Sequence, residues 1–306
     1  MADASAATVH RSAPAELVVR SRPGLRAVRL RILSSLVLAP IAIGAVWFGS
    51  PWLPLLTAAA ATVMAWEWGR LCWTERSGTV ALAAMEPRIF SLQPSGLVLV
   101  AVVLAAVLAA AMAATGIGIG LSVAGAVVVF IIAGRERHAF PIWLASGALW
   151  IALPCVLLLW LAQRDGSGPA TLLWLLASVW ATDIGAYVFG SQLGGPRLAP
   201  RWSPRKTWSG LLGGVFCAAL VGWATARLLS EPAVLPLVML SAGLAIVGQF
   251  GDLAESAAKR RFGVKDSSDL IPGHGGLLDR LDGLLAVIPA VALVTALRGD
   301  SVLAWS

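Results

Sequence analysis

Long runs of apolar residues alternate along the chain with short polar segments. Runs of about 17–25 apolar residues match the length at which an α-helix crosses a bilayer. We expect nine membrane-spanning helices, over residues 32–48, 52–71, 97–114, 117–133, 140–162, 170–193, 208–229, 233–250 and 281–297. Only "ATGIG" separates the third run from the fourth, so one long tilted helix over 97–133 is the alternative there. The pattern predicts an all-α, polytopic integral membrane protein.

The composition agrees with a chain whose solvent is a lipid bilayer. Hydrophobic residues make up 58% and charged residues 13% of the 306 positions. Soluble domains average about 45–50% apolar and about 25% charged residues. A single water-soluble core could not bury so much apolar surface, and this excludes an ordinary soluble protein.

The first 28 residues are polar and include several arginines. No small-residue cleavage site follows the first apolar run before the second begins, so we expect a retained tail and not a signal peptide. We divide the chain into the tail (1–28), N-terminal transmembrane helices (29–169) and a C-terminal region (170–306) that carries the candidate chemistry.

Lysine and arginine are distributed very unevenly between the two sides of the predicted bundle. If the N-terminus is cytoplasmic, the opposite face carries only Arg164 and Arg298, with Arg227 near the end of the seventh run. The cytoplasmic segments then contain Arg76, Arg88, Arg135, Arg137, Arg197, Arg201, Arg205, Lys206, Lys259, Arg260, Arg261, Lys265 and Arg280. This bias predicts a cytoplasmic N-terminus. The net charge of +7 reflects the same bias and suits anionic lipid headgroups. No basic domain stands apart from the membrane, so no nucleic-acid partner is expected.

Three polar clusters interrupt the apolar C-terminal region, and all three map to the cytoplasmic side. The first is "WATDIGAYVFG", residues 180–190, where Asp183 and Tyr187 lie four residues apart on one helix face. Charges within a membrane span are functional candidates by default. We interpret Asp183 as a carboxylate that faces a water-filled cavity; the alternative is a carboxyl group hydrogen-bonded inside the bundle.

The second cluster is "PRLAPRWSPRKTWSG", residues 196–210. Its three prolines exclude a regular helix, so we expect a structured loop at the membrane surface. Ser203, Lys206 and Thr207 come just before a helix start, where exposed amides and cations suit a phosphate. The alternative is positive-inside charge together with a tryptophan anchor at the interface.

The third cluster spans residues 251–282. If the eighth helix continues past the membrane, one stripe carries two carboxylates, a hydroxyl and an ammonium group. These belong to Asp252, Glu255, Ser256 and Lys259. After a glycine-rich turn that contains His274, the acids Asp279 and Asp282 flank Arg280 at the start of the last helix. Asp279 could simply cap that helix, but paired acids also suit Mg²⁺, which prefers oxygen ligands.

Taken together, the three clusters indicate chemistry on phosphates. Carboxylates from two helix ends could share Mg²⁺, with cations from two loops around it, which would stabilise a pentavalent phosphorus and a departing pyrophosphate. The sequence contains no G-x-x-x-x-G-K-[ST] motif, so these loops would have to hold any nucleotide. The three cysteines and three histidines are scattered and do not suggest a zinc site. We expect a membrane-embedded, metal-dependent phosphoryl or nucleotidyl transfer site.

Residues 256–282, "SAAKRRFGVKDSSDLIPGHGGLLDRLD", closely resemble the signature of the phosphatidate cytidylyltransferases, or CDP-diacylglycerol synthases. The matching positions are Ser256, Lys259, Arg260, Lys265, Asp266, His274, Gly275, Gly276, Asp279, Arg280 and Asp282. "TDIGAYVFG" and "LAPRWSPRKTWSG" resemble two further family segments, although Arg205 replaces a usual Lys and Ser209 a common Glu. "RILSSLVLAP" and "EWGRL" resemble the opening of the family, and Ala258 departs from it at one packing position.

The resemblance implies a Mg²⁺-dependent, homodimeric enzyme of the bacterial inner membrane that converts CTP and phosphatidate to CDP-diacylglycerol and pyrophosphate. It implies that Asp252 and Asp279 hold the metal, and we expect Glu255 and Asp282 to support them. A second, monovalent cation is left open. We expect the lipid phosphate to attack the α-phosphorus of CTP in line, without a covalent enzyme intermediate.

The predicted catalytic residues are Asp252, Lys259, Arg260, His274, Asp279 and Arg280. The predicted substrate-binding residues are Asp183, Tyr187, Ser203, Lys206, Thr207, Ser256, Lys265, Asp266, Gly275 and Gly276. Two other classes remain open: a transporter for a phosphorylated solute, since charged residues within spans also mark transport sites, and a non-catalytic lipid-binding scaffold.

Overall fold

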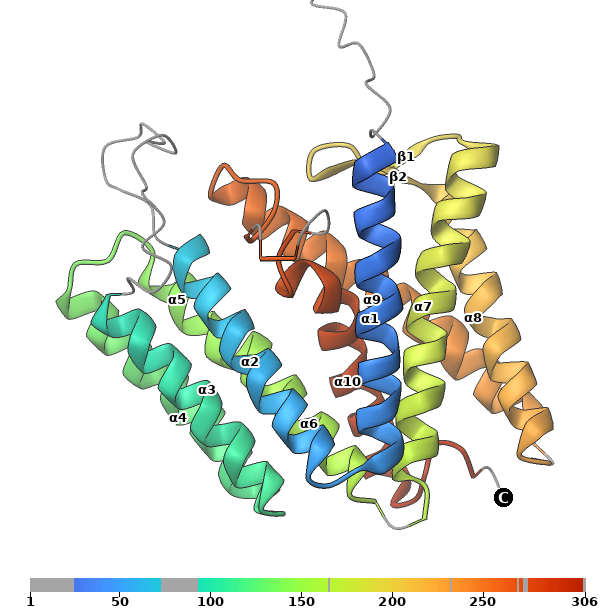
Figure 1. Ribbon diagram of the computed structural model, residues 1–306, viewed down its shortest axis with the longest axis horizontal. Helices are drawn as coiled ribbons and strands as arrows, with labels where there is room; N and C mark the ends of the chain where they lie inside the picture. Colours follow the sequence, from blue (N-terminus) through green and yellow to red (C-terminus); the bar gives the residue numbers. More distant parts are fainter. Residues whose placement is uncertain are drawn as a thin grey trace, which may run out of the picture.

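The computed structural model describes residues 25–72, 93–164, 166–231, 233–268, 270–271 and 275–304, and the side chains of α1 from Leu36 onward. Most of the predicted tail, the loop arginines Arg76 and Arg88, and His274 lie outside the described residues. The described chain is almost entirely helical (Figure 1).

The elements are α1 (Leu25–Phe48), α2 (Trp52–Leu71), α3 (Pro94–Ala111), α4 (Thr115–Arg135), α5 (Pro141–Gly147), the π-helical turn η1 (Ala148–Ala152), α6 (Leu153–Ala162), α7 (Gly168–Leu193), β1 (Arg197–Ala199), β2 (Ser203–Thr207), α8 (Trp208–Leu228), α9 (Val234–Arg261) and α10 (Leu278–Arg298).

Helices occupy all nine of the predicted intervals. Seven are long and apolar enough to cross a membrane, namely α3, α4, the continuous segment Pro141–Ala162, α7, α8, α9 and α10. The described apolar part of α1, Leu36–Phe48, is shorter, and α2 contains Glu67 and Arg70. The structure confirms an all-α, multi-pass membrane protein, while the total of nine spans stays a prediction.

The ambiguous interval 97–133 contains two helices, and the alternative of one long helix is wrong. The chain reverses after α3 at Ala113, whose φ is +61°, a left-handed conformation that no continuing helix can contain. α3 and α4 then pack against each other. A Cβ atom on Gly125 would lie 2.0 Å from Val102 Cγ1, so the small residue permits this close approach.

The interval 140–162 is one continuous helical segment in which the π-helical turn η1 separates α5 from α6. Pro154 is the second residue of α6, and because proline has no amide hydrogen, a regular helical bond is missing at that point. The Trp68 indole of α2 donates a 2.8 Å hydrogen bond to the Trp143 carbonyl of α5. A Cβ atom on Gly147 would lie 2.3 Å from the Trp68 ring, so these helices are closely fitted beside residue 67.

Two groups of helices flank α10 (Figure 1). In one group α7 packs along α8 and α8 along α9, and in the other α2 through α6 pack together. α10 contacts α9 on one side and α6 and α2 on the other, so it joins the two groups. Large apolar side chains such as Phe130, Phe216 and Leu220 remain exposed, as expected of faces that meet lipid.

The segment 196–207 forms an antiparallel hairpin of β1 and β2, which agrees with the prediction that its prolines exclude a helix. The hairpin leads directly into α8, where the Thr207 hydroxyl accepts a 3.1 Å hydrogen bond from the Gly210 amide and caps the helix. Arg260, at the end of α9, donates to the Trp202 carbonyl of the hairpin turn. The hairpin therefore lies at the same end of the bundle as the end of α9.

Candidate functional site

The predicted extension of the eighth membrane helix is confirmed, because α9 continues to Arg261. Its polar stripe is organised by contacts along the helix. The Ser256 hydroxyl donates a 3.3 Å hydrogen bond to Asp252 Oδ1, and Lys259 Nζ lies 3.0 Å from Glu255 Oε1. Two predicted metal-binding acids therefore each have a polar neighbour one turn further along α9.

Asp252 is also joined to the hairpin. Lys206 of β2 forms an ion pair with Asp252 Oδ2, and the two side chains are 18% and 31% exposed. The second and third clusters of the sequence are thus brought together in space. A cation from one predicted phosphate-binding segment faces an acid from the predicted metal-binding segment.

A buried group of charges links α9 to α10. Lys259, only 8% exposed, lies 3.0 Å from Glu255 and 2.6 Å from Asp279 Oδ1. The second oxygen of Glu255 is buried and has no hydrogen-bond partner among the described residues. One ammonium group thus faces two carboxylates. One negative charge of this group is therefore not balanced by Lys259 and could be balanced by a further cation.

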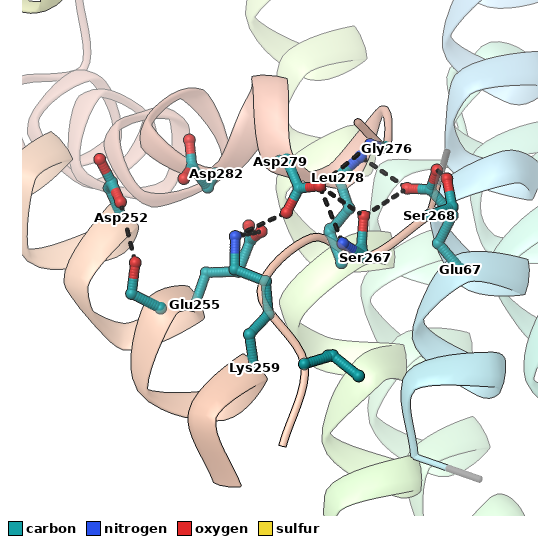
Figure 2. A network of polar contacts seen from close by, with 12 residues as sticks. Glu67, Asp252, Glu255, Lys259, Ser267, Ser268, Gly276, Leu278, Asp279 and Asp282 are labelled. Carbon is teal, nitrogen blue, oxygen red and sulfur yellow. Dashed lines mark hydrogen bonds and ion pairs between the residues drawn. The ribbon is translucent and has the colours of Figure 1, made fainter. Parts of the chain in front are cut away.

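Asp279 lies in the first turn of α10, and its second oxygen holds the loop that precedes the helix (Figure 2). Asp279 Oδ2 accepts hydrogen bonds from the Ser267 amide at 2.8 Å, the Ser267 hydroxyl at 3.1 Å and the Gly276 amide at 3.0 Å. The simple interpretation that Asp279 caps its own helix does not describe these contacts. Its donors other than Lys259 come from the loop before α10.

Glu67 of α2 caps α10 instead, and sequence reasoning missed it. Glu67 is fully buried, and its two oxygens accept from the amides of Leu277 at 2.9 Å and Leu278 at 2.7 Å. Hydroxyl groups of Ser268 and Ser267 donate to the same carboxylate at 2.5 Å and 3.3 Å. An acid inside an apolar run is itself a signal of function, and this rule could have drawn attention to Glu67.

Three acids from different helices line one pocket. Asp183 of α7, Asp252 of α9 and Asp282 of α10 face it, together with apolar side chains and Ser178. The Ser178 hydroxyl is buried and has no hydrogen-bond partner within the described residues. Asp282 accepts a 2.7 Å hydrogen bond from the Gly283 amide. The position of Asp183 agrees with a carboxylate that faces a cavity.

Other predicted site residues lie around this centre on exposed surfaces. Arg260, Lys265, Asp266 and Arg280 are exposed, and Ser203 is half-buried at the start of β2. Tyr187 is 76% exposed on α7, and none of the contacts described above includes it. The assignment of these residues to substrate stays a prediction.

The two predicted glycines shape the loop before α10. Gly275 has a φ of +82° and pairs with Ile271 in an isolated β-bridge, so a residue with a side chain would be strained there. At Gly276, a Cβ atom would lie 1.9 Å from Ser267 Oγ and 2.7 Å from Glu67 Oε1. The sequence predicted a glycine turn, and the structure shows that its second glycine is required by the approach of Glu67.

The donors of this site fit Mg²⁺. No group of three or more His, Cys, Asp and Glu side chains converges on a ready-made metal position within the described ranges. Mg²⁺ in phosphate-transfer sites is usually held by one or two carboxylates together with substrate phosphates, so a smaller protein donor set is sufficient. Asp252 and Asp282 share one pocket, and the unpartnered oxygen of Glu255 is a further suitable donor.

Known proteins resemble this chain over most of its length. A model of the cytidylyltransferase family matches residues 29–297. A phosphatidate cytidylyltransferase of Brucella suis is 37% identical over 273 residues, covering 89% of this chain and 95% of the relative. One from Pseudomonas aeruginosa is 35% identical, covering 87% and 96%. One from Staphylococcus aureus is 34% identical over 175 residues, covering 57% and 67%. Because the family model matches most of this chain, the chain belongs to the cytidylyltransferase family.

Proposed function

We propose that the protein transfers the cytidylyl group of CTP to phosphatidate, giving CDP-diacylglycerol and pyrophosphate. The names of its relatives support this assignment, and these relatives are matched over nearly their full length. The observation that carries the proposal is the joining of the three polar clusters at one end of the bundle. The Lys206–Asp252 pair joins the second cluster to the third, and the pocket lined by Asp183, Asp252 and Asp282 joins the first cluster to the third.

The reaction requires charge and positioning, and it requires no covalent enzyme intermediate. An oxygen of the lipid phosphate forms a bond to the α-phosphorus of CTP, and the bond from that phosphorus to the β-phosphate oxygen breaks. Pyrophosphate leaves with the electron pair. Such transfers are accelerated chiefly by fixed charges around the phosphates.

The basic residues divide by exposure in this proposal. Arg260, Lys265 and Arg280 are exposed around the end of α9 and the start of α10, where they can meet the phosphates of CTP and lipid. Lys259 is buried behind them and balances the charge of Glu255 and Asp279. Lys206, from the hairpin, faces Asp252 at the edge of the same region.

Asp252 and Asp279 would hold Mg²⁺, supported by Glu255 and Asp282. When bound, this ion would neutralise the triphosphate and the departing pyrophosphate. On the protein side, Asp279 is fixed through Oδ2 by three donors, while its Oδ1 accepts from Lys259. Hydrogen bonds of this kind commonly fix a ligating carboxylate in place.

We further propose that the site faces the cytoplasm of a bacterium, in a homodimer of the inner membrane. The cytoplasmic face would admit CTP, and the bilayer would deliver phosphatidate with its headgroup near the ends of α9 and α10. The bias of lysine and arginine along the sequence supports this orientation. The family resemblance supports the homodimer.

The proposal is tested with the purified full-length protein in detergent micelles and radiolabelled CTP. We expect labelled CDP-diacylglycerol only when phosphatidate and Mg²⁺ are both present, with pyrophosphate released in equal amount. A transporter or a lipid-binding scaffold would leave CTP intact under every condition. That outcome would overturn the proposed function.

A further inference from the structure

The buried carboxylate of Glu67 belongs to a helix outside the three clusters that carry the proposed chemistry. It lies on α2, while the described groups that donate to it all belong to the segment 267–278 before and at the start of α10. Figure 2 shows Glu67 approaching this segment from the side opposite Lys259, with Asp279 and the loop between them. Glu67 thus connects two parts of the chain separated by about 200 residues.

We propose that Glu67 is a positioning residue for the transfer reaction, because it fixes the start of α10 and, through Ser267, the carboxylate of Asp279. This inference rests on the proposed function, since it concerns how an acid of that site is held. Ser267 is the connecting residue. Its hydroxyl lies 3.3 Å from Glu67 Oε2 and 3.1 Å from Asp279 Oδ2, and its amide donates to the same Asp279 oxygen.

The bonding pattern requires a carboxylate at position 67. Each oxygen of Glu67 accepts one backbone amide, Oε1 from Leu277 and Oε2 from Leu278. Ser268 also donates to Oε1, while the single hydroxyl proton of Ser267 is shared between Glu67 Oε2 and Asp279 Oδ2. Hydroxyl groups can rotate, but the two amides are fixed by the backbone. A glutamine would therefore turn its NH₂ group toward one of them in either orientation, and would leave a buried donor unsatisfied.

The residues on both sides of Glu67 keep its carboxylate close to the start of α10. The neighbouring Trp68 is buried and is fixed by its hydrogen bond to Trp143 of α5. On the other side, the absence of a side chain at Gly276 lets the loop approach both Glu67 oxygens. The start of α10, which carries Asp279, Arg280 and Asp282, is thereby held against α2.

The test compares Glu67→Gln with Glu136→Gln in the full-length protein. Glu136 is a matched control because it also accepts a helix-start amide from another helix, that of Ser95 in α3, but lies outside the site. Since this carboxylate accepts a single amide within the described part of the chain, a glutamine carbonyl can replace it. We expect Glu67→Gln to lower kcat at least about tenfold, with KM for CTP and phosphatidate within about twofold of wild type. Glu136→Gln should keep the wild-type kcat.

A second readout needs no turnover. Hydrogen exchange measured without substrate or metal should be faster over residues 275–283 in Glu67→Gln, and unchanged there in Glu136→Gln. Faster exchange with an unchanged kcat would show that Glu67 is only a structural cap, and unchanged exchange would show that it does not fix α10. Either result overturns the inference, whereas a wild-type protein that makes no CDP-diacylglycerol overturns the proposed function itself.

If Glu67→Gln does not fold, Ser267→Ala tests in its place whether Glu67 acts on Asp279 through Ser267. This variant removes only the bridging hydroxyl and leaves the Ser267 amide bonded to Asp279. Ser268→Ala removes a hydroxyl that bonds Glu67 but, in the described contacts, not Asp279. We expect the larger loss of kcat, about threefold or more, in Ser267→Ala. Equal values of kcat in the two serine variants would contradict positioning through Ser267.

Discussion

Lys259 shows how a single buried cation can hold two helices together. It is 8% exposed and bonds Glu255 of its own helix and Asp279 of α10. Removing one partner of a buried ion pair leaves uncompensated charge, which typically destabilises a protein by about 3–5 kcal/mol. We therefore expect Lys259→Met to lower the free energy of unfolding by about this amount, measured by denaturant titration in micelles.

The control for this variant is Arg261→Met, at the end of the same helix. Arg261 is exposed, and its guanidinium group lies 5.2 Å from the centre of the Phe140 ring. An exposed cation–π contact contributes only about 0.5–1 kcal/mol. If Lys259→Met destabilises the protein no more than Arg261→Met, the buried charge group does not hold α9 to α10.

Gly276 is the residue at which a single added methyl group should be most disruptive. Its Cβ atom would overlap the Ser267 hydroxyl and both oxygens of Glu67. We expect Gly276→Ala to lower the rate of CDP-diacylglycerol formation at least about tenfold, because the loop that bonds Asp279 must move away from it. The measurement is the initial rate at saturating CTP and phosphatidate.

Gly243→Ala is the matched substitution, since a Cβ atom at this position of α9 meets no atom within 4 Å. Alanine also has the higher helix propensity, so this variant should be as stable and as active as wild type. A Gly276→Ala protein with the activity of Gly243→Ala would show that the close approach of Glu67 is not needed.

At the scale of elements, the β1–β2 hairpin and α9 meet through the ion pair of Lys206 and Asp252. Exchanging the two charges separates the structural role of Asp252 from its proposed role toward Mg²⁺. The double variant Lys206→Asp/Asp252→Lys should restore the protection of the hairpin that each single variant loses, as measured by hydrogen exchange. Its activity should stay at least about a hundredfold below wild type, because an ammonium group cannot hold a cation.

A double variant with wild-type activity would mean that Asp252 acts only through the ion pair.

The element scale also shows where sequence patterns are sufficient. Hydropathy located every helical interval, because membrane thickness fixes the length of an apolar run. The reversal at Ala113 and the pairing of β1 with β2 carry no comparable signal, since alanine has no turn preference and the hairpin is short.

At the scale of the molecule, α10 lies between two groups of helices and receives its N-terminal cap from one of them. The spacing of Asp252, Glu255 and Lys259 was readable from the sequence, because residues on one helix face recur at three to four positions. The contact of Glu67 with Leu278 was not, because no local pattern relates residues so far apart. The sequence therefore indicated the chemistry of the site, but it did not show how the site is anchored.

The most direct test of this account is the rate of CDP-diacylglycerol formation in three single variants of the full-length protein. Asp252→Asn and Asp279→Asn alter the proposed site, and Asp300→Asn makes the same change beyond the opposite end of α10. We expect losses of at least about a hundredfold in the first two and wild-type activity in the third. Full activity of both site variants would contradict the proposal that Asp252 and Asp279 hold the metal ion of the transfer reaction.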